Sequence, residues 1–310
     1  MSGVLKIGTR GSQLARWQTE WVRERLARHS VQTEVVVITT QGDADVDRPL
    51  QELSGTGFFT KSIEDALLDG RVDIAVHSLK DLPTTFPPGL ALGAVPERAD
   101  PRDVLVARDS NVTSIAQLPS GARIGTSSLR RVAQVRYLRS DLEVVPLRGN
   151  VPTRVQKVKQ GSDLEAALLA CAGLERLGLS EAIAVRLDPF EVMPAPGQGA
   201  LGIEIRADDA RALAAVRPLD HPETARCVAA ERRVLSGLGG GCQAPVATYV
   251  ETGKGAGGRG TGRLYGRVTA PDGSIQITAS AAFDSDDPNA TGVAVADLLR
   301  AQGALALLAR

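Results

Sequence analysis

The sequence predicts an α/β protein of several domains. Short β-rich runs alternate with segments whose apolar residues recur at helical spacing, and apolar strands separated by helices are typical of a sheet covered on both faces. The chain has 310 residues, which is too long for one ordinary hydrophobic core. Two polar, proline-containing segments, residues 96–103 and 188–199, divide it into three parts.

The first part alternates predicted strands with predicted helices. Ser12 is a candidate N-cap of a helix whose apolar residues recur at helical spacing, namely Leu14, Trp17, Trp21 and Val22. A second helix is expected over residues 60–68, because Gly70 favours a helix C-terminus. The predicted strands are residues 4–7, 35–39, 73–76 and 91–95.

The second and third parts follow the same reasoning. Predicted strands of the second part are residues 104–107, 123–125, 143–146 and 166–170, and its predicted helices are residues 129–139 and 153–160. A further strand is expected over residues 201–206. The third part is expected to contain a helix over 222–235, strands near 247–250, 263–269 and 275–281, a glycine-rich loop over 253–262 and a final helix over 291–308.

Composition excludes several classes of protein. Lys and Arg together number 36, as do Asp and Glu, so the basic excess of a general nucleic-acid or membrane-surface binder is missing. No stretch approaches the roughly 18–20 apolar residues of a membrane span, and residues 1–6 show no apolar signal region. Cys171, Cys227 and Cys242 form no close pair, so we expect no disulfide framework, no metal site and a cytoplasmic location. No long heptad pattern calls for an oligomer, and we expect a monomer.

Gly125–Arg131 is a candidate anion site. It follows a predicted strand and opens a predicted helix, where free backbone N–H groups, three hydroxyls and two guanidinium groups favour an anion. The alternative is a capped helix with a solvated basic face. Since Arg130 and Arg131 do not share a helix face, one of them is also a candidate for a structural role.

Similar residues follow two other predicted strands. Leu147–Asn150 with Arg154 comes after one strand, and Arg10–Ser12 comes after the first strand of the chain. In open α/β sheets, ligands bind at the carboxyl ends of the strands. We therefore expect these loops to form a basic site in a protein without net charge.

A lysine and an aspartate stand at the end of another predicted strand, in His77–Asp81. A carboxylate facing an arginine-rich site stays ionised and can stabilise a developing cation. The alternative for Lys80 and Asp81 is a surface ion pair in a turn, and His77 is interpreted as a hydrogen-bonded residue at the strand end.

The three cysteines differ in their surroundings. Cys171 follows an apolar run and Cys227 lies on an apolar helix face, so both are predicted to be buried thiols. Cys242 lies among glycines in Gly239–Pro245, where a large group can approach closely. From this context alone, an accessible reactive thiol and an incidental cysteine in a turn are equally compatible.

Six motifs together resemble the porphobilinogen deaminase family, and they occur in family order over nearly the whole chain. They are Arg10–Ala15, His77–Asp81, Gly125–Arg131, Leu147–Asn150, Pro196–Ala200 and Gly240–Gln243.

The resemblance implies three domains, namely two α/β lobes like those of periplasmic binding proteins and a smaller α+β C-terminal domain. Residues 1–98 with about 197–217 would form the first lobe, which carries the catalytic aspartate. Residues 99–196 would form the arginine-rich second lobe, and residues 218–310 the domain with the attachment cysteine.

The resemblance also implies a transferase of tetrapyrrole (haem) biosynthesis. Family members join four porphobilinogen molecules head to tail on a covalent dipyrromethane cofactor and release hydroxymethylbilane and ammonia. The cofactor would be held by a thioether to Cys242. Asp81 would stabilise the cationic azafulvene left by the loss of ammonia.

The acetate and propionate of each pyrrole make the growing chain a polyanion, which requires many cations. The residues that the resemblance assigns to cofactor and substrate binding are Arg10, Ser12, Phe59, Lys61, Ser78, Lys80, Thr126, Ser127, Ser128, Arg130, Arg131, Arg148, Gly149, Arg154, Arg176 and Gln198.

The sequence departs from the family in residues 51–57, which contain no lysine, although members often have lysines around Glu52 and Thr56. Two rival interpretations remain. One is a two-lobed anion-binding protein without catalysis, and the other is an inactive family member, against which the presence of both Asp81 and Cys242 argues.

Overall fold

The structure, a computed structural model, describes residues 3–39, 60–161, 163–240, 244–253 and 261–308. The chain divides into two compact units. Unit 1 comprises Met1–Ala99 and Gly199–Ala225, and unit 2 comprises Asp100–Gln198 and Arg226–Arg310.

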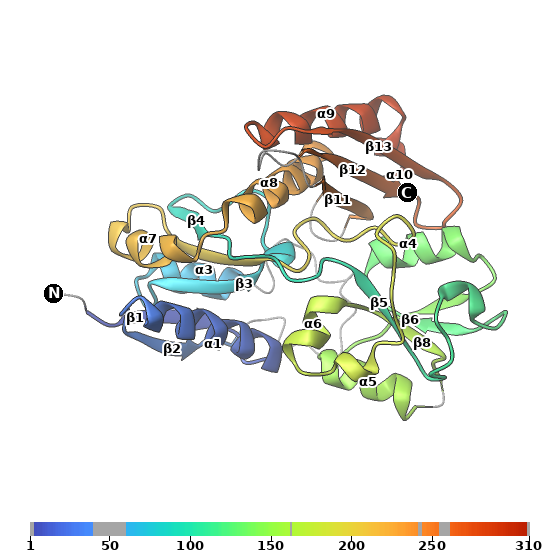
Figure 1. Ribbon diagram of the computed structural model, residues 1–310, viewed down its shortest axis with the longest axis horizontal. Helices are drawn as coiled ribbons and strands as arrows, with labels where there is room; N and C mark the ends of the chain where they lie inside the picture. Colours follow the sequence, from blue (N-terminus) through green and yellow to red (C-terminus); the bar gives the residue numbers. More distant parts are fainter. Residues whose placement is uncertain (1–2, 40–59, 162, 241–243, 254–260, 309–310) are drawn as a thin grey trace. The chain divides into compact units, whose positions relative to one another are not determined.

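Unit 1 contains a mixed five-stranded sheet of order β2-β1-β3-β10-β4 (Figure 1). Its strands are β1 (Leu5–Thr9), β2 (Thr33–Val37), β3 (Ile74–Ser78), β4 (Leu90–Ala94) and β10 (Leu201–Arg206). β1 is parallel to β2 and β3, whereas β10 is antiparallel to β3 and β4. The carboxyl ends of β1 and β3 therefore lie at the same edge of the sheet.

Helices cover both faces of this sheet. The helices are α1 (Gln13–Arg28), α3 (Lys61–Leu68), the 3₁₀ turn η1 (Leu79–Asp81) and α7 (Ala210–Val216). One core contains Val22 of α1, Ile74 of β3 and Val216 of α7, and another contains Ile63 of α3 and Ala75 of β3. Because neighbouring residues of β3 lie in different cores, the sheet is buried on both faces.

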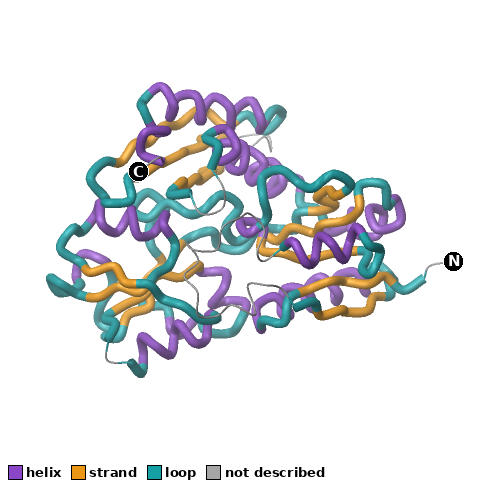
Figure 2. The backbone as a smooth tube through the Cα atoms, turned by 180° about the vertical axis from the view of Figure 1, so that it is seen from behind, coloured by secondary structure: helices purple, strands orange, loops and turns teal. Residues whose placement is uncertain are grey.

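Unit 2 contains a second five-stranded sheet, of order β7-β6-β8-β5-β9. The strands are β5 (Asp103–Ala107), β6 (Arg123–Gly125), β7 (Glu143–Val145), β8 (Ala166–Ala170) and β9 (Val185–Arg186), and the helices beside them are α4 (Leu129–Leu138), α5 (Val151–Lys159) and α6 (Cys171–Arg176). β6 is parallel to β7 and β8, and β5 is antiparallel to β8 and β9. Figure 2 shows helices on both sides of these strands.

The C-terminal part of unit 2 is an antiparallel three-stranded sheet of order β11-β12-β13. It comprises β11 (Val246–Gly253), β12 (Thr261–Thr269), β13 (Gln276–Phe283) and the helices α9 (Pro288–Ala301) and α10 (Ala304–Leu308), together with α8 (Pro222–Gly237), whose residues through Ala225 belong to unit 1. Val234 of α8, Leu264 of β12 and Leu299 of α9 share its core. Sheets and helices thus confirm the predicted α/β class with a C-terminal α+β part.

The elements differ from the prediction in three places. The predicted final helix over 291–308 is wrong, because α9 ends before Gly303, whose φ is +89°, and α10 begins after it. The short helices α6 and α7 and the two-residue strand β9 escaped the prediction, since so few residues show no clear periodicity. On α1 the buried side chains include Ala15, Gln18 and Leu26, whereas Trp17 and Trp21 are half-buried.

Among the described segments, no helix combines the length and the apolarity of a membrane span.

Candidate active site

A pocket in unit 1 brings four of the predicted site residues together. Its wall contains Arg10, Ser12, Ser78 and Asp81. These residues come from segments more than sixty positions apart in the sequence. The remaining lining residues are Leu14, Ala15, Gln18, Thr60, Val76 and His77.

The start of α1 positions the first two of these residues. β1 ends at Thr9, and Ser12 caps α1 with its hydroxyl, which accepts a hydrogen bond from the Ala15 amide at 3.3 Å. Arg10 lies between the strand and the cap and is half-buried. This confirms Ser12 as the predicted N-cap and places a guanidinium group at the carboxyl edge of the sheet.

The end of β3 positions the other two. Ser78 ends the strand, and Lys80 and Asp81 follow in η1. Gln18 of α1 donates a hydrogen bond from Nε2 to Ser78 Oγ at 2.9 Å, and the Leu79 amide donates to the Ala200 carbonyl at 3.0 Å. Asp81 is exposed, so its carboxylate is open to a ligand in the pocket.

In unit 2, Ser127 joins two of the predicted anion-binding loops. Its Oγ donates to the Leu147 carbonyl at 2.9 Å and accepts from the Leu147 amide at 3.1 Å. The loop that opens α4 is therefore tied to the loop that follows β7. Ser128, the N-cap of α4, makes no side-chain capping bond, so the first amides of the helix remain available for an anion.

The loop after β7 presents an arginine with an unsatisfied donor. Within the described part of the chain, Arg148 Nη2 is buried and has no hydrogen-bond partner. The carbonyl of Gly149, a residue whose φ is +110°, accepts a hydrogen bond from Arg154 Nε at 2.7 Å. A buried guanidinium nitrogen without an acceptor is costly, and a ligand carboxylate would satisfy it.

Arg130 and Arg131 have a buried partner that the sequence did not indicate. Both are buried, and each places a guanidinium nitrogen 2.8 Å from Asp103, which is fully buried. Gln198 Nε2 donates to the same carboxylate at 2.7 Å. Burial alone would raise the pKa of Asp103, but attraction to the two arginines outweighs it and holds the pKa well below its usual range.

These contacts give Arg130, Arg131 and Gln198 structural roles inside unit 2. The sequence left open a structural role for either Arg130 or Arg131. In the structure, both arginines have such a role. Their predicted role in ligand binding stays a prediction.

Two further predicted residues, Arg176 and Lys61, lie on helices. Arg176 ends α6, and burial lowers its pKa to about 10, so the group stays charged at neutral pH while partly removed from water. Lys61 begins α3, is exposed and lies 3.9 Å from Asp65.

The predicted attachment residue Cys242, Phe59 and the lysine-free segment 51–57 lie outside the described residues. The other two cysteines, Cys171 and Cys227, are buried, as predicted.

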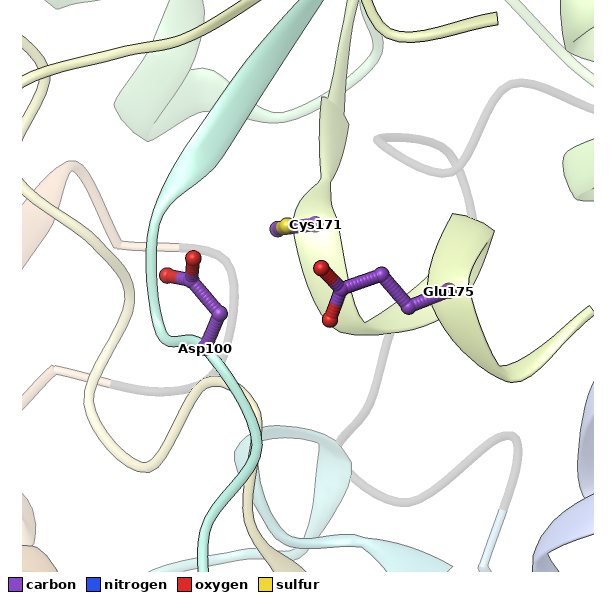
Figure 3. A group of neighbouring side chains, drawn as sticks. All are labelled: Asp100, Cys171 and Glu175. Atoms are coloured by element: carbon purple, nitrogen blue, oxygen red, sulfur yellow. The ribbon is translucent and has the colours of Figure 1, made fainter. Parts of the chain in front are cut away.

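Asp100, Cys171 and Glu175 resemble a metal-ligand group, because their ligand atoms lie within 4.8 Å of one another. Figure 3 shows both carboxyl groups turned toward the thiol. However, Arg102 binds Asp100 at 2.6 Å and Arg186 binds Glu175 at 2.8 Å. Burial and the nearby carboxylates raise the pKa of Cys171 to about 12, so the thiol stays protonated. We interpret this group as a partly exposed ion-pair network around a buried thiol and assign no metal to it.

Sequence reasoning missed three polar residues at the unit 1 pocket, namely Gln18 and Thr60, which line it, and Glu204, which contacts the lining residue His77. Each is buried. The available signal was a polar side chain at a core-facing position, such as Gln18 between Ala15 and Val22 on α1.

Two family models match the chain. One, described as "Porphobilinogen deaminase, dipyromethane cofactor binding domain", matches residues 5–214, and the other, "Porphobilinogen deaminase, C-terminal domain", matches residues 225–301.

Curated relatives match over nearly their whole length. The porphobilinogen deaminase of Chromobacterium violaceum is 48% identical over 305 residues, which are 98% of this chain and 96% of the relative. That of Roseiflexus sp. is 46% identical over 312 residues, covering 100% of both chains. Among solved structures, a periplasmic substrate-binding protein of an ABC transporter from Coxiella burnetii aligns with a TM-score of 0.43 and 16% identity, over 72% of this chain and 94% of that chain.

Proposed function

The chain belongs to the porphobilinogen deaminase family, and from this membership we propose that Asp81 is its catalytic carboxylate. The protein is a transferase of tetrapyrrole biosynthesis. It deaminates porphobilinogen, joins four units head to tail on a dipyrromethane cofactor, and releases hydroxymethylbilane and ammonia.

The position of Asp81 in the unit 1 pocket is the main observation that supports its catalytic assignment. Departure of ammonia from porphobilinogen leaves positive charge on the pyrrole ring, and a fixed carboxylate beside that ring lowers the barrier. Asp81 shares the pocket with Arg10, Ser12 and Ser78. Arg10 supplies a cation for a substrate carboxylate, and the two hydroxyls supply hydrogen bonds. Lys80, in the same 3₁₀ turn as Asp81, adds a second positive charge at this edge.

The unit 2 loops suit the acidic cofactor and the growing chain. The unsatisfied Arg148 Nη2 and the uncapped start of α4 offer donors to carboxylates, and Arg154 and Arg176 add positive charge. These residues fit a dipyrromethane, which would be bound with Thr126 and Ser128 and attached through a thioether to Cys242. When bound, the dipyrromethane supplies the pyrrole end to which the first substrate unit is joined.

We further propose the three-domain division at residues 1–98 with 197–217, 99–196 and 218–310. The separate C-terminal sheet and the position of β10 between β3 and β4 support it. We also propose that the enzyme acts as a monomer in the cytoplasm, where buried thiols such as those of Cys171 and Cys227 stay reduced.

Asp81→Asn tests the catalytic assignment. The substitution removes the charge and keeps the size, so we expect a folded protein that still carries its cofactor. Loss of one preorganised electrostatic group corresponds to about 3–4 kcal/mol of barrier, or about 100- to 1,000-fold in rate. Single-turnover addition of porphobilinogen to the purified holoenzyme measures this rate.

Asp69→Asn is the matched control. Asp69 is an exposed carboxylate of unit 1 outside the pocket, and its ion pair with Arg71 spans 3.4 Å. The control is expected to react at the wild-type rate. A wild-type rate in Asp81→Asn would remove Asp81 from the chemistry.

A further inference from the structure

A buried pair of ionisable groups links the strand that carries the pocket to its neighbour. His77 Nε2 on β3 lies 3.1 Å from Glu204 Oε2 on β10, and the side chains are only 4% and 0% exposed. Glu204 is opposite Ala75 in the antiparallel ladder. His77 and Glu204 therefore lie on the same face of the sheet as diagonal neighbours.

Burial makes His77 important as a polar neighbour of Glu204. Among the described residues, neither carboxylate oxygen of Glu204 accepts a hydrogen bond. A buried carboxylate without donors is strongly unfavourable unless a cation accompanies it. His77 Nε2, 3.1 Å from Glu204 Oε2, is the polar group that lies beside this carboxylate.

Glu64 of α3 completes the cluster. Its side chain is buried on the face of the sheet that α3 covers, together with Ala75. Burial raises the pKa of Glu64 above its usual value, and the charge of Glu204 adds to the rise. Glu64, His77 and Glu204 are thus three buried ionisable side chains of unit 1.

The cluster lies directly behind the pocket. His77 lines the pocket wall, immediately precedes Ser78 and is four residues from Asp81 in the chain. On the opposite side, Gln18 holds Ser78 with a 2.9 Å hydrogen bond. The end of β3 is thus fixed from α1 on one side and from β10 on the other.

We propose that His77 is a positioning residue, which acts with Glu204 to fix the turn that presents Ser78 and Asp81 to the substrate. This proposal rests on the proposed role of Asp81. In this role His77 and Glu204 do not contact the reacting atoms. His77 affects the rate only by fixing the position of the Asp81 carboxylate. A displacement of about 1 Å in a reacting group costs on the order of 100-fold in rate.

The test is a double-variant cycle on the holoenzyme, made of His77→Gln, Glu204→Gln and both together. Each single change leaves one buried partner unpaired, and we expect kcat per cofactor-loaded molecule to fall about 10- to 100-fold with KM unchanged, because Arg10 and the other cations remain. In the double variant, two neutral amides bridge the same strands. We expect it to recover most of the lost kcat.

Asp73→Asn is the control for a purely structural effect. It breaks the 3.0 Å ion pair with Arg206 at the other end of the same strands. We expect a lower unfolding temperature and a wild-type kcat. If His77→Gln does not fold, the kcat of the nearly isosteric Glu204→Gln is compared with that of the wild type and of Asp73→Asn.

Two outcomes would overturn the positioning role. One is a wild-type kcat in the folded single variants, and the other is a double variant no faster than the slower single variant. Measuring Asp81→Asn in parallel separates the two proposals. A slow Asp81→Asn with fast His77 and Glu204 variants rejects the positioning role alone, whereas a fast Asp81→Asn rejects the catalytic assignment.

Discussion

At the residue scale, Asp103 shows how one buried carboxylate can hold several groups in place. It binds Arg130 and Arg131 at 2.8 Å and Gln198 at 2.7 Å. Arg130 Nη1 also donates to the Met193 carbonyl at 2.5 Å. Removing the charge of Asp103 would leave two desolvated guanidinium groups without their anion, which is costly.

Asp103→Asn is therefore expected to lower the free energy of unfolding by about 3–5 kcal/mol at pH 7. Because the pKa of Asp103 is depressed in the folded state, its contribution is complete above the unfolded-state pKa of about 3.9. It is lost as the pH falls below that value. Urea unfolding at pH 7 and pH 3 measures both effects, and the difference between wild type and variant is expected to shrink at pH 3.

Asp141→Asn is the control, because its 2.7 Å pair with Arg139 lies at the surface. That variant is expected to lose less than about 1 kcal/mol. An equally small loss for Asp103→Asn at pH 7 would contradict the role given to the buried cluster.

Sequence reasoning identified four residues of the unit 1 pocket but not the buried contacts of Arg130 and Arg131. Arg10–Ser12 and the Lys80–Asp81 pair were each identified because they come at the end of a predicted strand, where ligands bind in open α/β sheets, and Ser78 was assigned through the family resemblance. The Arg130 and Arg131 contacts were not predictable, since Asp103 is 27 positions away and nothing local signals that all three are buried.

At the element scale, Ser127 couples the loop that opens α4 to the loop that follows β7. Its hydroxyl satisfies both the amide and the carbonyl of Leu147. Ser127→Ala would leave both groups unpaired, and we expect a loss of about 1–3 kcal/mol of stability. Because Arg148 follows Leu147 directly, we also expect a higher KM for porphobilinogen.

Thermal unfolding and steady-state kinetics check this expectation. Ser236→Ala is the control, because its hydroxyl bonds only within α8, to the Arg233 carbonyl at 3.0 Å. An unchanged KM and unfolding temperature in Ser127→Ala would show that the two loops hold their positions without this hydroxyl.

The segment before Gly199 is held by hydrogen bonds that the sequence did not predict. Its prolines and glycines suggested a linker over residues 188–199. In the structure, the Met193 amide binds Gln134 at 2.9 Å, the Gly197 amide binds the buried Glu231 at 2.8 Å, and the Thr248 amide binds the Pro194 carbonyl at 3.0 Å. Proline and glycine indicate the absence of regular structure, and these bonds show that most of this segment is nevertheless anchored in unit 2.

At the scale of the whole molecule, the two five-stranded sheets share one plan. Each has three parallel strands followed by two that run antiparallel to their neighbours, in the orders β2-β1-β3-β10-β4 and β7-β6-β8-β5-β9. In both, several predicted site residues follow the parallel strands, such as Arg10 after β1 and Arg148 after β7. The alternation of strands and helices predicted this class, but the pairing order depends on contacts far apart in the sequence.

The chain passes between the units at Ala99–Asp100, Gln198–Gly199 and Ala225–Arg226. We expect bending at the first two, which lie in the predicted linkers, as the product chain grows, because the site must accommodate each added unit. Small-angle scattering of enzyme trapped with different numbers of added units is expected to show a change in the radius of gyration relative to the starting holoenzyme. Identical scattering curves would restrict the rearrangement to local loops.

Intact-protein mass spectrometry before and after addition of porphobilinogen tests the central claim most directly. We predict that the wild-type protein carries two linked pyrroles on Cys242 and gains further units. Asp81→Asn is expected to carry the two pyrroles but to gain units far more slowly. Cys242→Ala is expected to carry none, whereas Cys227→Ala is expected to behave as wild type. A folded wild-type protein whose mass stays that of the bare chain in the presence of porphobilinogen would contradict the account.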